Sequence, residues 1–290
     1  MSIALDTQCL QCHLRRNLEV AQSLGTAEQA MEFARDMLRM YLDAPAGVSS
    51  PWFNPLAGDL LTKHFGLPED RYVEEKEMSN RFVLERLDTI RSKVESAPDP
   101  VYAGLQFAVL GNYLDFSALQ GHVSFEKLDN MLDEALAMDL DREIYADFCA
   151  RLEKGGKLLY VTDNAGEIGF DRVCAEVIAR RYPQVEITFC VRGAVTINDA
   201  TRVDAEAVGI PFPVIDNGNR IPGTQLDMLS PEAKAALEGA DLILAKGMAN
   251  VETMYGCGYP VYYAFLVKCQ RFVSLFGKPL MTPMLVKEQK

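Results

Sequence analysis

The chain has 290 residues, a formal net charge of −12 and a pI of about 4.8. This acidic balance argues against nucleic acid or an anionic membrane as a partner, because both bind basic protein surfaces. No apolar run approaches the roughly 18 residues of a membrane span, and no leader-like pattern opens the sequence. Seven cysteines are too few, and odd in number, for a secreted disulfide framework, so we expect a cytoplasmic protein with reduced thiols.

The first half of the sequence, residues 1–154, predicts a helical domain. Thr26 with Gln29 three residues later is a capping-box signature, and the apolar residues that follow recur at helical spacing. A segment that is apolar on most sides is expected to be a buried helix. The helices are expected over residues 26–44, 71–97, 100–117, 124–138 and 141–156, the 100–117 segment being the buried one.

The second half, residues 155–290, alternates short apolar strands with helices. This β-α-β order predicts a Rossmann-like α/β/α sandwich around a mostly parallel, doubly wound sheet. The fold class is therefore α/β, with the helical domain placed before the sandwich. Strands are expected over 157–162, 185–193, 212–216 and 241–247, and the segments 259–269 and 278–286 are candidates for further strands.

Polar residues follow each of the first four expected strands. In a parallel doubly wound sheet these positions gather at one edge, where ligands bind. Capping of the next helix is the simpler explanation for any one of them. Four such placements on one edge favour a site. The residues are Asp163 and Asn164, then Arg192, Gly193, Asn198 and Asp199, then Asp216 and Asn217, and finally Lys246 and Gly247.

These residue types indicate phosphoryl chemistry at a metal ion. Two carboxylates and an amide oxygen are hard ligands suited to Mg²⁺ or Mn²⁺. A lysine can hold a phosphate, and the helix that Gly166 opens offers N-terminal amides to an anion. The segment "DNAGEIG" is not a G-x-G-x-x-G fingerprint, and Ala165 stands where a haloacid-dehalogenase-type phosphatase needs a second acid.

Several blocks in the same order resemble a known family. They are "CLQCHLRRNLEVA", "GNYLDF", "DNAGEIGFD", "INDAT", "KGMANVETM" and "LVKC". Together they resemble the damage-control phosphatases, also called domain of unknown function 89. The CxxC near the N-terminus resembles the stand-alone prokaryotic branch of that family.

The resemblance implies a metal-dependent phosphatase that hydrolyses small phosphate esters, such as sugar phosphates or damaged phosphometabolites. It assigns a divalent ion (Mn²⁺, Mg²⁺, Co²⁺ or Ni²⁺) to Asp163, Asn164 and Asp199, and phosphate binding and catalysis to Lys246. Asp163 is also the carboxylate that would attack phosphorus if a water molecule does not. The residues of the matching blocks that are assigned to the wall of the substrate site are Asn112, Asp115, Glu167, Asn250 and Glu252.

Two other functions stay open from the sequence. The sheet edge would equally serve a protein that binds a nucleotide or coenzyme without hydrolysing it. The motif at Cys9 and Cys12 would suit a structural metal site, with His13, Cys257 or Cys269, or a redox pair, or simple packing of a helix start. A c-type haem needs C-x-x-C-H, which is present, but also export, for which no signal is seen. The sequence makes no prediction of the oligomeric state.

Overall fold

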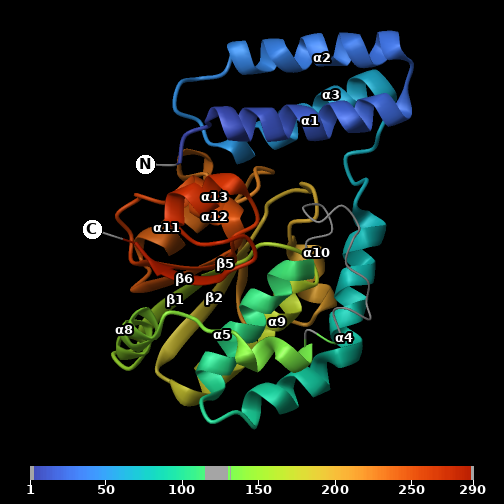
Figure 1. Ribbon diagram of the computed structural model, residues 1–290. Helices are drawn as coiled ribbons and strands as arrows, with labels where there is room; N and C mark the ends of the chain where they lie inside the picture. The colour runs from blue at the N-terminus through green and yellow to red at the C-terminus, as the bar shows by residue number, and fades with distance from the viewer. Residues whose placement is uncertain (1–2, 115–129, 131, 289–290) are drawn as a thin grey trace.

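The structure is a computed structural model that describes residues 3–114, 130 and 132–288 (Figure 1). A six-stranded sheet in the order β3-β2-β1-β4-β5-β6 forms its centre. Strands β1 to β5 are parallel and β6 runs antiparallel to β5, which confirms the expected fold class and both candidate strands. The strands are β1 (Gly156–Val161), β2 (Val185–Val191), β3 (Val214–Asp216), β4 (Leu242–Lys246), β5 (Val261–Leu266) and β6 (Pro283–Lys287).

Helices cover both faces of this sheet, because successive side chains of its strands point to opposite sides. In β1, Leu158 and Tyr160 enter the hydrophobic core on one face, while Leu159 and Val161 enter the core on the other. Within the described ranges, no helix is long and apolar enough to cross a membrane. One face is covered by α5 (Pro100–Gly111), α8 (Arg142–Leu152) and α9 (Glu167–Arg181), and the other by α11 (Pro231–Glu238), α12 (Gly247–Met254) and α13 (Gln270–Phe276).

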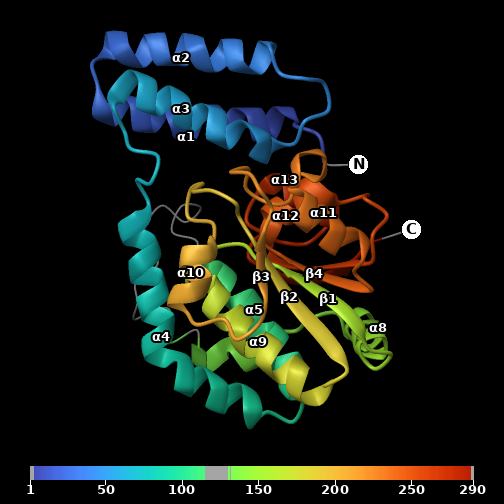
Figure 2. The same cartoon turned by 180° about the vertical axis from the view of Figure 1, so that it is seen from behind.

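The helices of the first half divide between two places (Figures 1 and 2). Helices α1 (Thr7–Leu24), α2 (Ala27–Leu42) and α3 (Phe53–Phe65) pack on one another around Phe33 and Met37, and the capping box at Thr26 is confirmed. Helix α4 (Val73–Glu95) and α5 instead lie against α9, where Val83, Phe107 and Phe170 belong to one core. The domain boundary near residue 155 stays a prediction, and a common hydrophobic core crosses it.

The strand order places a topological switch point between β1 and β4. From β1 the chain moves outward to β2 and β3, and it then returns to β4 on the other side of β1 before continuing to β5. The connections that leave β1 and β4 run in opposite directions, so the loops after these two strands separate. Folds of this kind bind ligands in the resulting crevice outside the carboxyl ends of the strands. Helix α10 (Arg202–Ala207) follows the loop after β2, close to this edge. Of the helix expected over 124–138, most lies outside the described residues.

Candidate active site

Backbone pairing brings the three expected metal ligands together. The loop after β1 pairs with the loop after β2 through an antiparallel bridge between Asn164 and Asp199. The amide of Ala200 donates to the carbonyl of Asp163 at 2.8 Å. The residues Asp163, Asn164 and Asp199 are only 6%, 4% and 4% exposed. The three residues are therefore neighbours at the carboxyl end of β1, and their side chains are buried.

Two amide side chains join Asp163 to Glu167. Asn112, at the end of α5, donates its Nδ2 hydrogens to Asp163 Oδ2 at 2.9 Å and to Glu167 Oε2 at 2.8 Å. Asn164 Nδ2 donates to the same two oxygens, at 2.8 and 3.2 Å. Each carboxylate thus accepts two amide hydrogen bonds, which fix its orientation. The structure brings Asn112 and Glu167 to the ligands, while Asp115 lies outside the described residues.

Lys246 is fully buried at the end of β4. Its ammonium donates to Glu167 Oε1 at 2.7 Å, to Asp171 Oδ1 at 2.8 Å and to the carbonyl of Ala108 at 2.7 Å. Burial alone would lower the pKa of Lys246, but the two carboxylates raise it above its ordinary value. An ammonium has three hydrogens, and protein acceptors receive all of them here. Contact between Lys246 and a phosphate stays a prediction, and it requires one of these bonds to be exchanged.

Asp171 and Tyr160 extend this buried group and were missed from the sequence. The hydroxyl of Tyr160 donates to Asp171 Oδ1 at 2.8 Å. Burial raises the pKa of Asp171 to about 7, against the opposing effect of Lys246. The spacing of Glu167 and Asp171, four residues apart on α9, places both carboxylates on one helix face, a signal that could have found Asp171.

Asn250 connects the carboxyl ends of β1 and β4. It lies in α12, is fully buried, and donates its Nδ2 hydrogens to the carbonyls of Thr162 and Lys246 at 2.9 and 2.6 Å. Its Oδ1 accepts from the hydroxyl of Thr224 at 2.8 Å. Both ends of the amide are therefore engaged by protein groups, and this arrangement holds the two strand ends in place.

Glu252 lies on the same helix but next to a different part of the chain. Its carbonyl accepts from the amide of Ile3 at 2.8 Å. Burial raises the pKa of the half-buried Glu252 carboxyl to about 7, with Arg271 lowering it and Asp6 raising it. These neighbours belong to the N-terminal segment and α13, so the structure does not bring Glu252 to the Asp163 cluster.

The cysteines of the CxxC motif lie in the first turns of α1. Cys9 is half-buried and Cys12 is exposed, and neither forms a disulfide. Burial, together with Glu252 and Asp6, raises the pKa of the Cys9 thiol to about 12. Such a thiol carries little thiolate at neutral pH, which disfavours a redox role. Throughout the described ranges, no three His, Cys, Asp or Glu side chains form a group that could hold a metal ion.

Three backbone amides around the N-terminus of α9 are engaged by protein acceptors, which weighs against the anion site expected from Gly166. The Gly166 amide donates to Oδ1 of Asn80, on α4, at 2.7 Å. The amides of Ile168 and Gly169 donate to the carbonyls of Asn164 and Gly166 at 3.2 and 2.9 Å. Protein acceptors thus satisfy these donors. A pyrophosphate cradle of the Rossmann type, which relies on free amides at this position, is disfavoured.

The residues present fit a hard divalent ion. The expected ligand set holds two carboxylates and one amide, all oxygen donors of the kind that Mg²⁺ and Mn²⁺ prefer. Gly247, which directly follows Lys246, lets the backbone approach Asp163. A Cβ at Gly247 would lie 1.9 Å from Asp163 Oδ2, so only glycine leaves the carboxylate its place.

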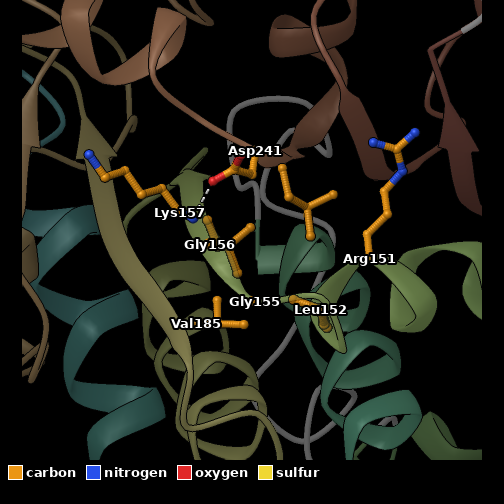
Figure 3. Close-up of a pocket in the computed structure, with 9 residues that line it drawn as sticks. Arg151, Leu152, Gly155, Gly156, Lys157, Val185 and Asp241 are labelled. Carbon is orange, nitrogen blue, oxygen red and sulfur yellow. Dashed lines mark hydrogen bonds between the residues drawn. The ribbon is translucent and has the colours of Figure 1, made fainter.

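A small cavity at the opposite edge of the sheet is not a competing site (Figure 3). It lies at the amino ends of β1, β2 and β4 and encloses about 10 Å³, room for one water molecule. Asp241 Oδ2 accepts from the backbone amide of Lys157 there, at 2.9 Å. Gly155 and Gly156, expected to cap α8, have φ of 75° and 103° and turn the chain into β1.

The sequence matches the model of the damage-control phosphatase ARMT1-like domain over residues 5–282. The chain belongs to the damage-control phosphatase family. This result confirms the resemblance seen in the sequence, and it supports phosphatase activity. The CxxC detail of the prokaryotic branch stays a prediction.

Three proteins of other organisms are similar to this member of the damage-control phosphatase family. The chain is 35% identical to a damage-control phosphatase of Archaeoglobus fulgidus over 211 residues, 70% of each chain. It is 30% identical to a damage-control phosphatase of Pyrococcus horikoshii over 258 residues, 85% of each chain. An uncharacterized protein of Methanocaldococcus jannaschii is 30% identical over 297 residues, covering 99% of this chain and 96% of that protein.

A solved structure shows the same fold. It is the crystal structure of a DUF89 family protein from Pyrococcus horikoshii, with a TM-score of 0.84 and 22% identity. The superposition covers 99% of both chains. The likeness therefore includes the three-helix layer of α1 to α3 as well as the sheet.

Proposed function

We propose that this chain is a divalent-metal-dependent phosphatase of small phosphate esters, such as sugar phosphates or damaged phosphometabolites. The observation that carries the proposal is the convergence of Asp163, Asn164 and Asp199 at the switch point of the sheet, through the bridge between residues 164 and 199. Family membership supplies the reaction class. We also propose that the protein is located in the cytoplasm.

The proposed ion is held by oxygens of Asp163, Asn164 and Asp199. When bound, a divalent ion supplies charge neutralisation and polarisation of a phosphoryl oxygen. The donor set selects hard ions such as Mn²⁺ or Mg²⁺, and Co²⁺ and Ni²⁺ are the further candidates. The surrounding residues keep the carboxylates oriented and exclude bulk water, since each of the three ligands is at most 6% exposed.

We propose that a water molecule attacks phosphorus, rather than Asp163. Asp163 Oδ2 accepts hydrogen bonds from both Asn112 and Asn164, and these bonds stabilise its charge and reduce its nucleophilicity. Glu167 Oε2 accepts from the same amides, and Lys246 holds the other carboxylate oxygen. Glu167 is therefore a fixed, buried carboxylate beside Asp163, and its part in the proposal is to hold the side chains of Asn112, Asn164 and Lys246 in position.

Two lysines share the proposed phosphate chemistry. Lys246 holds Glu167 and Asp171, and it can contact a phosphoryl oxygen only by releasing one of its three acceptors. Lys268 follows β5 at the same edge of the sheet and is half-buried, and its backbone amide donates to Met248 Sδ of α12 at 3.2 Å. We propose it as a second cation for the phosphate. The edge rule would have predicted it had β5 been assigned with the other strands.

The test is phosphate release by chelator-stripped protein. Sugar phosphates and p-nitrophenyl phosphate are assayed with Mn²⁺, Mg²⁺, Co²⁺ or Ni²⁺ added back. We expect release that depends on the ion and falls by about 100-fold or more in Asp163→Ala, because the ion loses a charged ligand.

Asp216→Ala is the matched control. Asp216 also ends a strand at this edge, but it pairs with the half-exposed Arg202 at 2.6 Å. The control should keep wild-type turnover. Release without any added ion, or full turnover by folded Asp163→Ala, contradicts the proposed function.

A further inference from the structure

Arg192, the first residue after β2, carries a charge that is entirely buried. Its side chain is 0% exposed, and it belongs to the largest fully buried side chains of the described protein. A buried guanidinium is costly unless acceptors surround it. The acceptors of its hydrogen bonds therefore indicate the role of Arg192.

Those contacts reach three separate segments of the site. Arg192 Nε donates to Asp199 Oδ2 at 2.7 Å. Nη2 donates to the carbonyl of Thr162 at 2.9 Å and makes a long contact of 3.5 Å with Asn250 Oδ1. One side chain thus ties the end of β1, the loop that carries Asp199, and α12. The planar guanidinium donates several hydrogen bonds in fixed directions, whereas the ammonium of a lysine donates all of its hydrogen bonds from one atom.

The third guanidinium nitrogen, Nη1, indicates that a contribution to stability alone does not explain why an arginine occupies this position. Among the described residues, no acceptor reaches the buried Nη1 of Arg192. An unsatisfied buried donor lowers stability, and such groups in native proteins often mark function. By contrast, Arg202 makes a comparable arginine–aspartate pair with Asp216 where the arginine side chain is 51% exposed.

We propose that Arg192 is a positioning residue for the divalent-ion site. Its Nε holds one oxygen of Asp199, and its Nη2 holds the carbonyl that immediately precedes Asp163. The two carboxylates are thereby kept at a fixed separation before any ion binds. The inference rests on the proposed function, and it adds that the affinity for the ion depends on a residue outside the ligand set.

The experiment measures Mn²⁺ binding to chelator-stripped protein by isothermal titration calorimetry, without substrate. The variants are Arg192→Lys, which keeps the charge, and Arg192→Gln, which keeps a donor but removes the charge. Each should bind Mn²⁺ about 10–100-fold more weakly, the usual loss when a residue that orients a ligand is changed. Arg202→Lys should bind like the wild type. Saturating Mn²⁺ should restore much of the turnover while KM for the phosphate ester stays unchanged.

Wild-type affinity in whichever folded Arg192 variant is obtained overturns the inference and leaves the proposed function standing. So does an equal loss of affinity in Arg202→Lys, because the effect would then not be specific to the site. The same titration of the wild type is repeated with Mg²⁺, Co²⁺ and Ni²⁺, and failure to bind any of the four ions overturns both the inference and the proposed function. Weaker binding in the Arg192 variants alone supports the inference.

Discussion

Single residues decide how closely the backbone approaches the candidate site. Gly247 has a φ of +75°, and a Cβ there would lie 1.9 Å from Asp163 Oδ2 and 2.2 Å from its Cγ. The first residue of α12 therefore determines where Asp163 lies. Gly258 has a similar φ of +80°, but no described atom lies within 4 Å of where its Cβ would be. A comparison of the two glycines therefore distinguishes the effect of the positive φ from the effect of the close contact with Asp163.

We predict that Gly247→Ala lowers both stability and Mn²⁺ affinity, whereas Gly258→Ala lowers stability alone. The left-handed conformation costs an L-residue about 1–2 kcal/mol. The free energy of unfolding in urea should therefore fall by about this amount in both variants. Only Gly247→Ala displaces Asp163, so only this variant should also lose ion binding and turnover. Equal Mn²⁺ affinity in the two folded variants would show that Asp163 can move without consequence.

Residue types at strand ends predict which residues become neighbours at this edge of the sheet, but they do not predict the hydrogen-bond partners of the side chains. Asp163, Asn164 and Asp199 follow buried strands, and the edge rule predicts that they meet. The partners of Lys246 could not be predicted, because Ala108 lies 138 residues away and Glu167 lies 79 residues away in the chain. Glu252 belongs to a matching sequence block, yet its position on α12 turns it towards Asp6 and Arg271. Distant packing, which local pattern does not encode, decides such contacts.

At the scale of elements, the layer of α1 to α3 has a hydrophobic core of its own. It also contains a buried histidine, His13, that makes stability depend on pH. His13 on α1 is 9% exposed, and its Nδ1 is hydrogen-bonded to the hydroxyl of Tyr41. Burial lowers the pKa of His13 to about 4, with a raising effect of Asn54 and a further lowering effect of Arg16. The ring therefore stays neutral in the folded protein at neutral pH. It faces this core, so it does not serve a metal site with Cys9 and Cys12.

We predict that His13 makes the protein less stable in mild acid. Between pH 6.5 and 4 the unfolded chain binds a proton at this residue and the folded chain does not. The free energy of unfolding therefore falls as the pH falls through this window. From pH 7 to pH 5, the wild type should lose roughly 1–2 kcal/mol more than His13→Gln in urea unfolding. Identical losses in the two proteins would contradict the assignment.

Element types were predictable wherever the periodicity was strong. The β-α-β alternation predicts the parallel sheet, and the strands β4 and β5 are short apolar runs that are buried on both faces. The role of α4 and α5 was not predictable. Their apolar patterns indicate that each helix is buried against other elements, but not that it packs on α9, which begins more than 50 residues further along the chain.

At the scale of the whole molecule, strand order decides where the site lies. The sequence of elements fits several strand orders, and the observed order β3-β2-β1-β4-β5-β6 makes β1 and β4 neighbours. That neighbourhood brings the Asp163 loop to Lys246 and Gly247. It also places Asn112, from the first half of the chain, between two carboxylates of the second half. The site is therefore complete only when both halves are folded together.

The most direct test of the central claim is the location of the bound ion. Crystals of the whole chain soaked with Mn²⁺ give an anomalous difference map that shows manganese independently of the protein atoms. The proposed function predicts one strong peak in contact with oxygens of Asp163, Asn164 and Asp199, which is absent from Asp163→Ala crystals. A strong peak at Cys9 and Cys12 instead, or no peak in crystals of protein that hydrolyses phosphate esters with Mn²⁺, would contradict it.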